Sequence, residues 1–187
     1  SNTVVSRIAQ ATGAIPITHE HGCVEFDEDH RRTKLALVSA GTSPNVYGAL
    51  LVGLGCEQTS LGDVKKAIES SGKPVEGILI QQEGGSPEAE ARGIGIVKRL
   101  QAEAEAQGRV PCGAGGLVVG VQCGGSDWTT AVAGNTVIGA MADLVIENGG
   151  SVLMSEVMGF PGSEHIVASN SVSREVGLQV LDMVADL

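Results

Sequence analysis

The chain has 187 residues, enough for one domain with a sizeable core, and 42% of them are hydrophobic while only 2% are aromatic. Its formal net charge is −10, from 12 basic and 22 acidic residues, and no basic stripe is present, which argues against nucleic acid or an anionic membrane surface as a partner. No apolar run approaches the ~20 residues that span a bilayer and no secretory signal is visible, so we expect a cytoplasmic protein with four reduced cysteines.

An apolar run, a glycine-rich polar turn and a helical stretch follow one another five times along the chain. The apolar runs predict strands at residues 14–18, 47–54, 75–80, 117–121 and 151–155. The intervening patterns predict helices at residues 3–11, 27–40, 61–70, 87–107, from just after 127 to about 148, and 171–186. Ser60 and Ser86 are residue types that cap helix N-termini, and Gly149 with Gly150 ends the fifth helix.

Strands that alternate with helices pair in parallel through right-handed crossovers. Continuous Val, Ile and Leu runs fit strands that are buried on both faces of a sheet. The sequence therefore predicts a three-layer, Rossmann-like α/β fold with a mainly parallel five-stranded sheet, formed by a single domain over residues 1–187. Because ligands bind where the C-terminal ends of parallel strands share an edge, we expect the polar turns to form a site there.

The first polar turn carries His19, His21 and Cys23 at alternate positions. An extended backbone would place all three side chains on one side, and imidazole with thiolate suits iron, zinc or cobalt. The alternative is an ordinary polar turn in which the cysteine fills space in the core.

The second turn contains Cys56 and Glu57, directly after an apolar run. The preceding Gly-Leu-Gly resembles a dinucleotide-binding fingerprint, but Gln58 replaces its third glycine and Glu57 stands where the pyrophosphate would lie. A tight turn with a core cysteine is the alternative to a ligand site here.

The turn after the fourth strand is the most informative of the five. Its glycines allow a ligand to approach the backbone, and the helix that follows offers free N–H groups to an anion. One of its polar residues is expected to cap that helix instead. The turn consists of Gln122, Cys123, Gly124, Gly125, Ser126 and Asp127.

Glu156 and His165 flank an irregular segment that contains two glycines and a proline. Irregular segments at strand ends are often binding loops, although a solvated loop with an ion pair is the alternative. His30 lies in the charged run DEDHRR, which indicates a solvent-facing helix surface.

Four runs carry a resemblance to a known family. THEHGC, SPNVYGALLVGLGCEQ, VGVQCGGSD, and SEVMGFPGSEHI followed by SVSREVG resemble the altronate/galactarate dehydratase family, and together they cover residues 18–177. The resemblance implies dehydration of a hexonic or hexaric sugar acid to a 2-keto-3-deoxy acid, with a divalent metal, Fe(2+), as cofactor. It also implies that the chain is the central part of a larger dehydratase with further domains. The acidic, apolar helices allow a homodimer.

The resemblance distributes roles over the polar turns. It implies a metal site, a substrate cleft formed by the turn that spans Gln122 to Asp127, and a set of acid/base residues. The metal or substrate contacts would be His19, His21, Cys23, Cys56 and Glu57, and the acid/base residues would be His21, Glu156 and His165.

Alternatives remain open at this point. The chain could be a scaffold whose turns complete a site in a C-terminal domain, or part of a related lyase that acts on sulfolactate. A nucleotide-binding module and an iron–sulfur cluster held by three of the cysteines are two further hypotheses.

Overall fold

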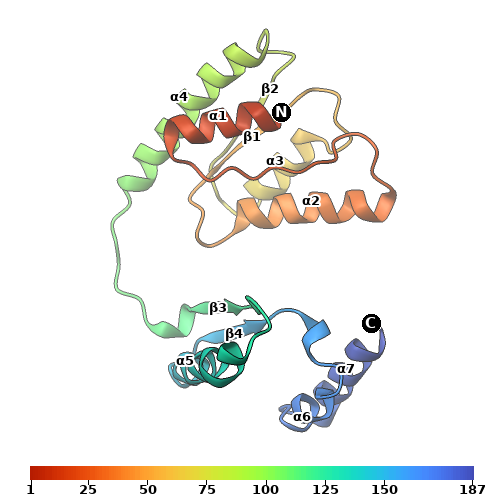
Figure 1. Ribbon diagram of the computed structural model, residues 1–187. Helices are drawn as coiled ribbons and strands as arrows, with labels where there is room; N and C mark the ends of the chain where they lie inside the picture. The colour runs from red at the N-terminus through yellow and green to blue at the C-terminus, as the bar shows by residue number, and fades with distance from the viewer. The chain divides into compact units, whose positions relative to one another are not determined.

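A computed structural model describes residues 1–187, and these divide into two compact units (Figure 1). Unit 1 comprises Ser1–Arg109 and unit 2 comprises Val110–Leu187. Each unit contains one pair of parallel strands with a helical crossover between them. The two units are therefore described separately.

Unit 1 is a two-stranded parallel sheet with four helices. Strands β1 (Ala49–Gly53) and β2 (Val75–Leu79) pair in register from Ala49 opposite Val75 to Gly53 opposite Leu79, and α3 connects them. The helices are α1 (Asn2–Thr12), α2 (Asp27–Thr42), α3 (Leu61–Glu69) and α4 (Ser86–Glu105). The Ser60 hydroxyl accepts the Asp63 N–H, which confirms it as the cap of α3.

Both faces of the sheet in unit 1 are covered, because successive strand residues point to opposite sides. Leu50 and Val52 pack in a cluster that contains residues of α1 and α4, while Ala49 and Leu51 pack in a cluster that contains residues of α2 and α3. The first cluster is built on Val4, Ile8, Ile78, Ile80, Ala89 and Val97, and the second on Val64, Ile68 and Val75.

Unit 2 is smaller and more open. Strands β3 (Val118–Val121) and β4 (Ser151–Met154) pair in parallel, and a π-helical turn, Thr130–Gly134, leads into the crossover helix α5 (Asn135–Glu147). The remaining elements are the short helices Ala114–Gly116, Val157–Gly159 and α6 (Glu164–Ser169), and the terminal helix α7 (Arg174–Ala185). Among its hydrophobic side chains Val145 alone is buried.

One helical stretch, Thr130–Glu147, has the length and apolar composition that could cross a membrane. Core helices of water-soluble proteins share these properties, so the stretch alone does not indicate a membrane.

The predicted five-stranded sheet is wrong. The structure has four short strands in two separate two-stranded sheets, so no common edge of five strand ends exists. The predicted first strand, residues 14–18, forms no ladder; Pro16 lacks a backbone donor, and Ile15 and Ile17 are 84% and 54% exposed.

Several other predictions are confirmed or corrected in the same way. The positions of the other four strands and their parallel pairing are confirmed. Burial of the strands on both faces is wrong for unit 2, where Val118 and Leu153 are mostly exposed. The segment between Glu156 and His165, which was expected to be irregular, contains the short helix Val157–Gly159 and the start of α6.

Candidate functional site

In unit 1 the loop that precedes α2 and the turn that follows β1 lie together, and Gln58 holds them. Its backbone N–H donates to the Gly22 carbonyl (2.8 Å), while its side-chain amide accepts from the Glu25 N–H and donates to the Glu25 carbonyl (both 3.1 Å). As a result, the Cys23 thiol lies 4.0 Å from the Cys56 carbonyl oxygen. Two residues predicted as metal ligands, from different turns, are thus in contact through the Cys56 backbone and not through its thiol, and both thiols are exposed and free.

Glu57 closes its own turn. One carboxylate oxygen accepts the Gly55 N–H at 2.6 Å, and Gly55 has a φ of 121°, which only glycine adopts readily. Nowhere in the chain do three or more His, Cys, Asp or Glu side chains gather closely enough to hold a metal ion. As they are placed, the residues do not fit a divalent ion, and iron remains a prediction from the resemblance.

His21 lies at the edge of an open hollow of about 410 Å³ in front of α2. Apart from His21, this hollow is lined by Val24, Glu25, Phe26, Asp29, Arg32 and Thr33. His19 does not line it; its carbonyl accepts the Asn2 side-chain amide, and its Nδ1 is buried without a partner.

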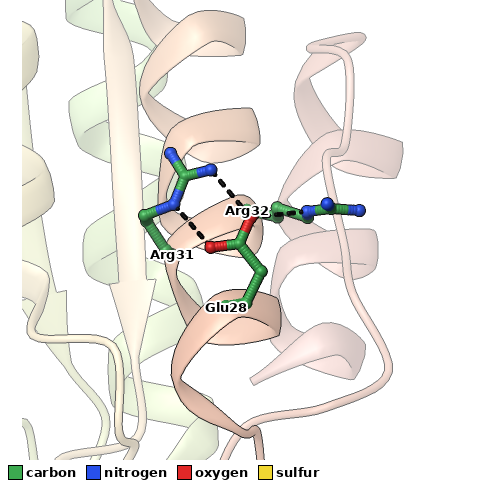
Figure 2. Close-up of polar contacts among 3 residues, drawn as sticks. All are labelled: Glu28, Arg31 and Arg32. Atoms are coloured by element: carbon green, nitrogen blue, oxygen red, sulfur yellow. Dashed lines mark hydrogen bonds and ion pairs between the residues drawn. The ribbon is translucent and has the colours of Figure 1, made fainter.

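The charged run at the start of α2 forms an ordered cluster (Figure 2). Glu28 accepts two hydrogen bonds from Arg31, both 2.8 Å, and one from the Nε of Arg32 at 3.0 Å. These two guanidinium groups lower the pKa of the Glu28 carboxyl to about 2. The run is exposed, as predicted, but its residue types alone did not indicate that Arg32 lines the same hollow as His21.

Unit 2 contains a second open hollow, of about 390 Å³, beyond the end of β3. Four of the six residues predicted to form the substrate cleft line it, and Gln122 and Gly124 do not. The lining residues are Cys123, Gly125, Ser126, Asp127, Trp128, Thr130, Ala131 and Asn135.

Asp127 is the helix cap in this hollow. One of its oxygens accepts the Thr129 hydroxyl and the backbone N–H groups of Thr129 (2.7 Å) and Thr130 (3.1 Å). The Thr129 hydroxyl and these N–H groups lower the pKa of the Asp127 carboxyl. The expectation that one polar residue of the turn caps the helix is thus confirmed, and it is Asp127.

Glu156 follows β4 and reaches across to the end of β3. Its carboxylate accepts the Cys123 N–H at 3.2 Å, which joins two of the predicted polar turns. His165 lies on α6 with an exposed side chain and lines neither hollow. The predicted residues therefore form two groups, one in each unit.

The fold thus defines an α/β protein with one parallel β-α-β pair in each unit, and one open hollow lies in each unit, in front of α2 in unit 1 and beyond β3 in unit 2. Two family profiles match the chain: "D-galactarate dehydratase/Altronate hydrolase, second domain" over residues 1–105, and "D-galactarate/Altronate dehydratase, C-terminal" over residues 114–187. The chain belongs to the D-galactarate/altronate dehydratase family. The two matched ranges coincide closely with units 1 and 2.

Curated relatives agree with this assignment. The chain is 31% identical to an altronate dehydratase of Bacillus subtilis, over 96% of this chain and 36% of that protein. It is also 31% identical to the (2R)-sulfolactate sulfo-lyase subunit beta of Chromohalobacter salexigens, over 94% of this chain and 45% of that protein. A galactarate dehydratase (L-threo-forming) of Escherichia coli is 31% identical over 75% of this chain and 28% of that protein.

The chain thus spans less than half the length of each of these relatives. No solved structure matches it significantly.

Proposed function

We propose that the chain is the central part of a hydro-lyase that removes water from a hexonic or hexaric sugar acid, such as altronate or galactarate, to give a 2-keto-3-deoxy acid. Membership of the dehydratase family carries this proposal. The names of the altronate and galactarate dehydratases among its relatives supply the substrate class. We further propose that the protein acts in the cytoplasm, together with the remaining domains of the full-length enzyme.

The reaction requires two proton transfers. A base removes the proton from the carbon next to the carboxylate, and an acid protonates the hydroxyl that leaves the neighbouring carbon as water. The enol that remains tautomerises to the 2-keto acid. The acid/base candidates that we carry into this proposal are His21 and His165, because imidazole is the side chain that most often serves as a general acid or base. Neither lines the hollow beyond β3, so their roles rest on the resemblance and not on the shape of that hollow.

The hollow beyond β3 is the substrate site in this proposal. It presents a glycine-rich backbone, which lets the oxygens of a sugar acid approach closely, while the N–H groups at the start of the helix are already capped by Asp127. Glu156 already accepts the Cys123 N–H, so a role in holding this loop is the alternative to a role in proton transfer.

A second candidate reaction is elimination from sulfolactate. The sulfo-lyase subunit matches almost the whole chain, over a larger share of its own length than the dehydratases do. Sulfite would then be the leaving group in place of water.

The test is turnover by the full-length enzyme with altronate, galactarate and (2R)-sulfolactate, supplied with and without Fe²⁺. The proposal requires a 2-keto-3-deoxy product from at least one sugar acid. His21→Ala and His165→Ala are each expected to lower kcat/KM by about 10²- to 10⁴-fold. Cys112→Ala, an exposed thiol outside both hollows, is the control. Sulfite release without sugar-acid turnover would contradict the dehydratase proposal and support the second candidate.

A further inference from the structure

Glu156 has an unusual backbone conformation. With φ 65° and ψ 67° it is left-handed, and among all 187 described residues it is the single non-glycine residue with positive φ. A side chain in this region is strained, and glycine would occupy the position at lower cost. Residues held in such conformations persist where the surrounding structure requires them, often at functional sites.

The position of Glu156 in the sheet shows what its conformation achieves. The β3–β4 ladder ends at Val121 opposite Met154, and Ser155 donates once more to the Val121 carbonyl. Beyond that point the backbones no longer pair. There the Glu156 side chain, in place of a backbone carbonyl, accepts the N–H of Cys123 at 3.2 Å.

The bond matters because the loop that it reaches is otherwise unsupported. Across residues 122–126, this bond to Glu156 is the one hydrogen bond that any backbone group makes. The loop contains two adjacent glycines, Gly124 and Gly125, so its intrinsic freedom is large. It nevertheless lines the hollow beyond β3, through Cys123, Gly125 and Ser126.

We propose that Glu156 is a positioning residue that orders the loop at residues 122–126 through the Cys123 N–H and so shapes the hollow for a sugar acid. The substrate part of this inference rests on the proposed function. The role requires a hydrogen-bond acceptor at the end of a long side chain and no proton transfer. Glutamine supplies the same acceptor, whereas alanine supplies none.

Amide hydrogen exchange at Cys123, measured by NMR, tests the positioning step without any substrate. In Glu156→Ala this amide is expected to exchange about tenfold faster than in the wild type, because its one hydrogen bond is lost. In Glu156→Gln the exchange rate is expected to return to within about threefold of the wild-type rate. Glu147→Ala, which removes an exposed carboxylate on α5, is the matched control. Equal exchange at Cys123 in all four proteins would overturn the proposal.

Binding and turnover of galactarate by the full-length enzyme test the functional step. Glu156→Ala is expected to raise KM about tenfold, and Glu156→Gln to restore it with an unchanged pH profile. If the glutamine variant loses kcat as fully as the alanine variant and one limb of the pH profile disappears, Glu156 carries a proton and the inference is wrong. If the wild type does not bind sugar acids but Cys123 exchange responds as expected, the proposed function fails while the positioning role stands.

Discussion

The contact between Gly41 and Ile68 sets how closely α2 and α3 approach. Gly41 is buried in the last turn of α2, and Ile68 of α3 is fully buried against it. A β-carbon at position 41 would overlap the Ile68 Cδ1 atom and would lie 3.0 Å from Cγ1 and 3.3 Å from Cγ2. The substitution Gly41→Ala is therefore expected to force the helices apart or Ile68 out of its rotamer.

The expected change in the free energy of unfolding for Gly41→Ala is the balance of two opposing effects. Overpacking of a core costs about 1–3 kcal/mol, while alanine in place of glycine in a helix contributes roughly 1 kcal/mol, so a net loss of about 1 kcal/mol is expected. Ile68→Val removes Cδ1 and alone costs about 0.5–1.5 kcal/mol. In the double variant the overlap with Cδ1 is gone, so a favourable coupling of about 1–2 kcal/mol is expected.

The free energy of unfolding would be measured by urea titration with far-UV circular dichroism, and hydrogen exchange of α2 and α3 would localise the change. Gly95→Ala on α4 is the control. Its β-carbon meets nothing within 4 Å, so it should stabilise by about 1 kcal/mol. If the effects of Gly41→Ala and Ile68→Val add to within roughly 0.5 kcal/mol, the two residues do not pack as described and the reasoning is refuted.

Three further predictions concern the polar clusters. The pKa of Glu28 is lowered, so its ion pairs stabilise the fold fully above its usual pKa of 4.5, and this stabilisation is lost as the pH falls towards about 2. NMR titration of the Glu28 carboxyl should give a midpoint of about 2, and a midpoint near 4.5 would contradict the cluster. Asp127→Ala should lower the thermal midpoint of unit 2 at pH 7, and the difference from the wild type should shrink in acid because the pKa of Asp127 is also lowered; a constant difference would exclude the cap. Gln58→Ala should speed alkylation of Cys23 but not of Cys112, as followed by mass spectrometry, and equal rates in the two proteins would show that Gln58 does not hold the loop.

The secondary structure was largely predictable because it depends on local patterns. Helix α3 begins directly after Ser60, the serine that the capping rule selects, and four of the apolar runs form strands. The fifth run failed for a reason that the sequence also contains. Pro16 interrupts it, and two of its apolar side chains, Ile15 and Ile17, remain in solvent.

Strand partners could not be predicted, because pairing is a tertiary property. The apolar pattern says that a strand has a buried face, but not which strand lies beside it. The pattern did not reveal the division near Arg109, since no proline- or serine-rich linker marks it. We expected five strand ends to share one edge of a sheet. The structure instead has two separate sheets, and the polar residues form two clusters, one in each unit.

The candidate site shows the same limit at the level of side chains. Cys56 and Cys123 lie in turns that follow strands, as predicted, but Cys23 follows no strand, because residues 14–18 form none. Residue type also did not show which hydrogen bonds the side chains of each turn make. Glu57, predicted as a ligand, is bonded to its own turn, while Gln58, counted only against a nucleotide fingerprint, holds two turns together. A polar side chain at a strand end satisfies the backbone before it is free for a ligand. A polar residue in a turn can therefore be proposed as a ligand or catalytic group only after the hydrogen bonds that it makes to the backbone of the turn are known.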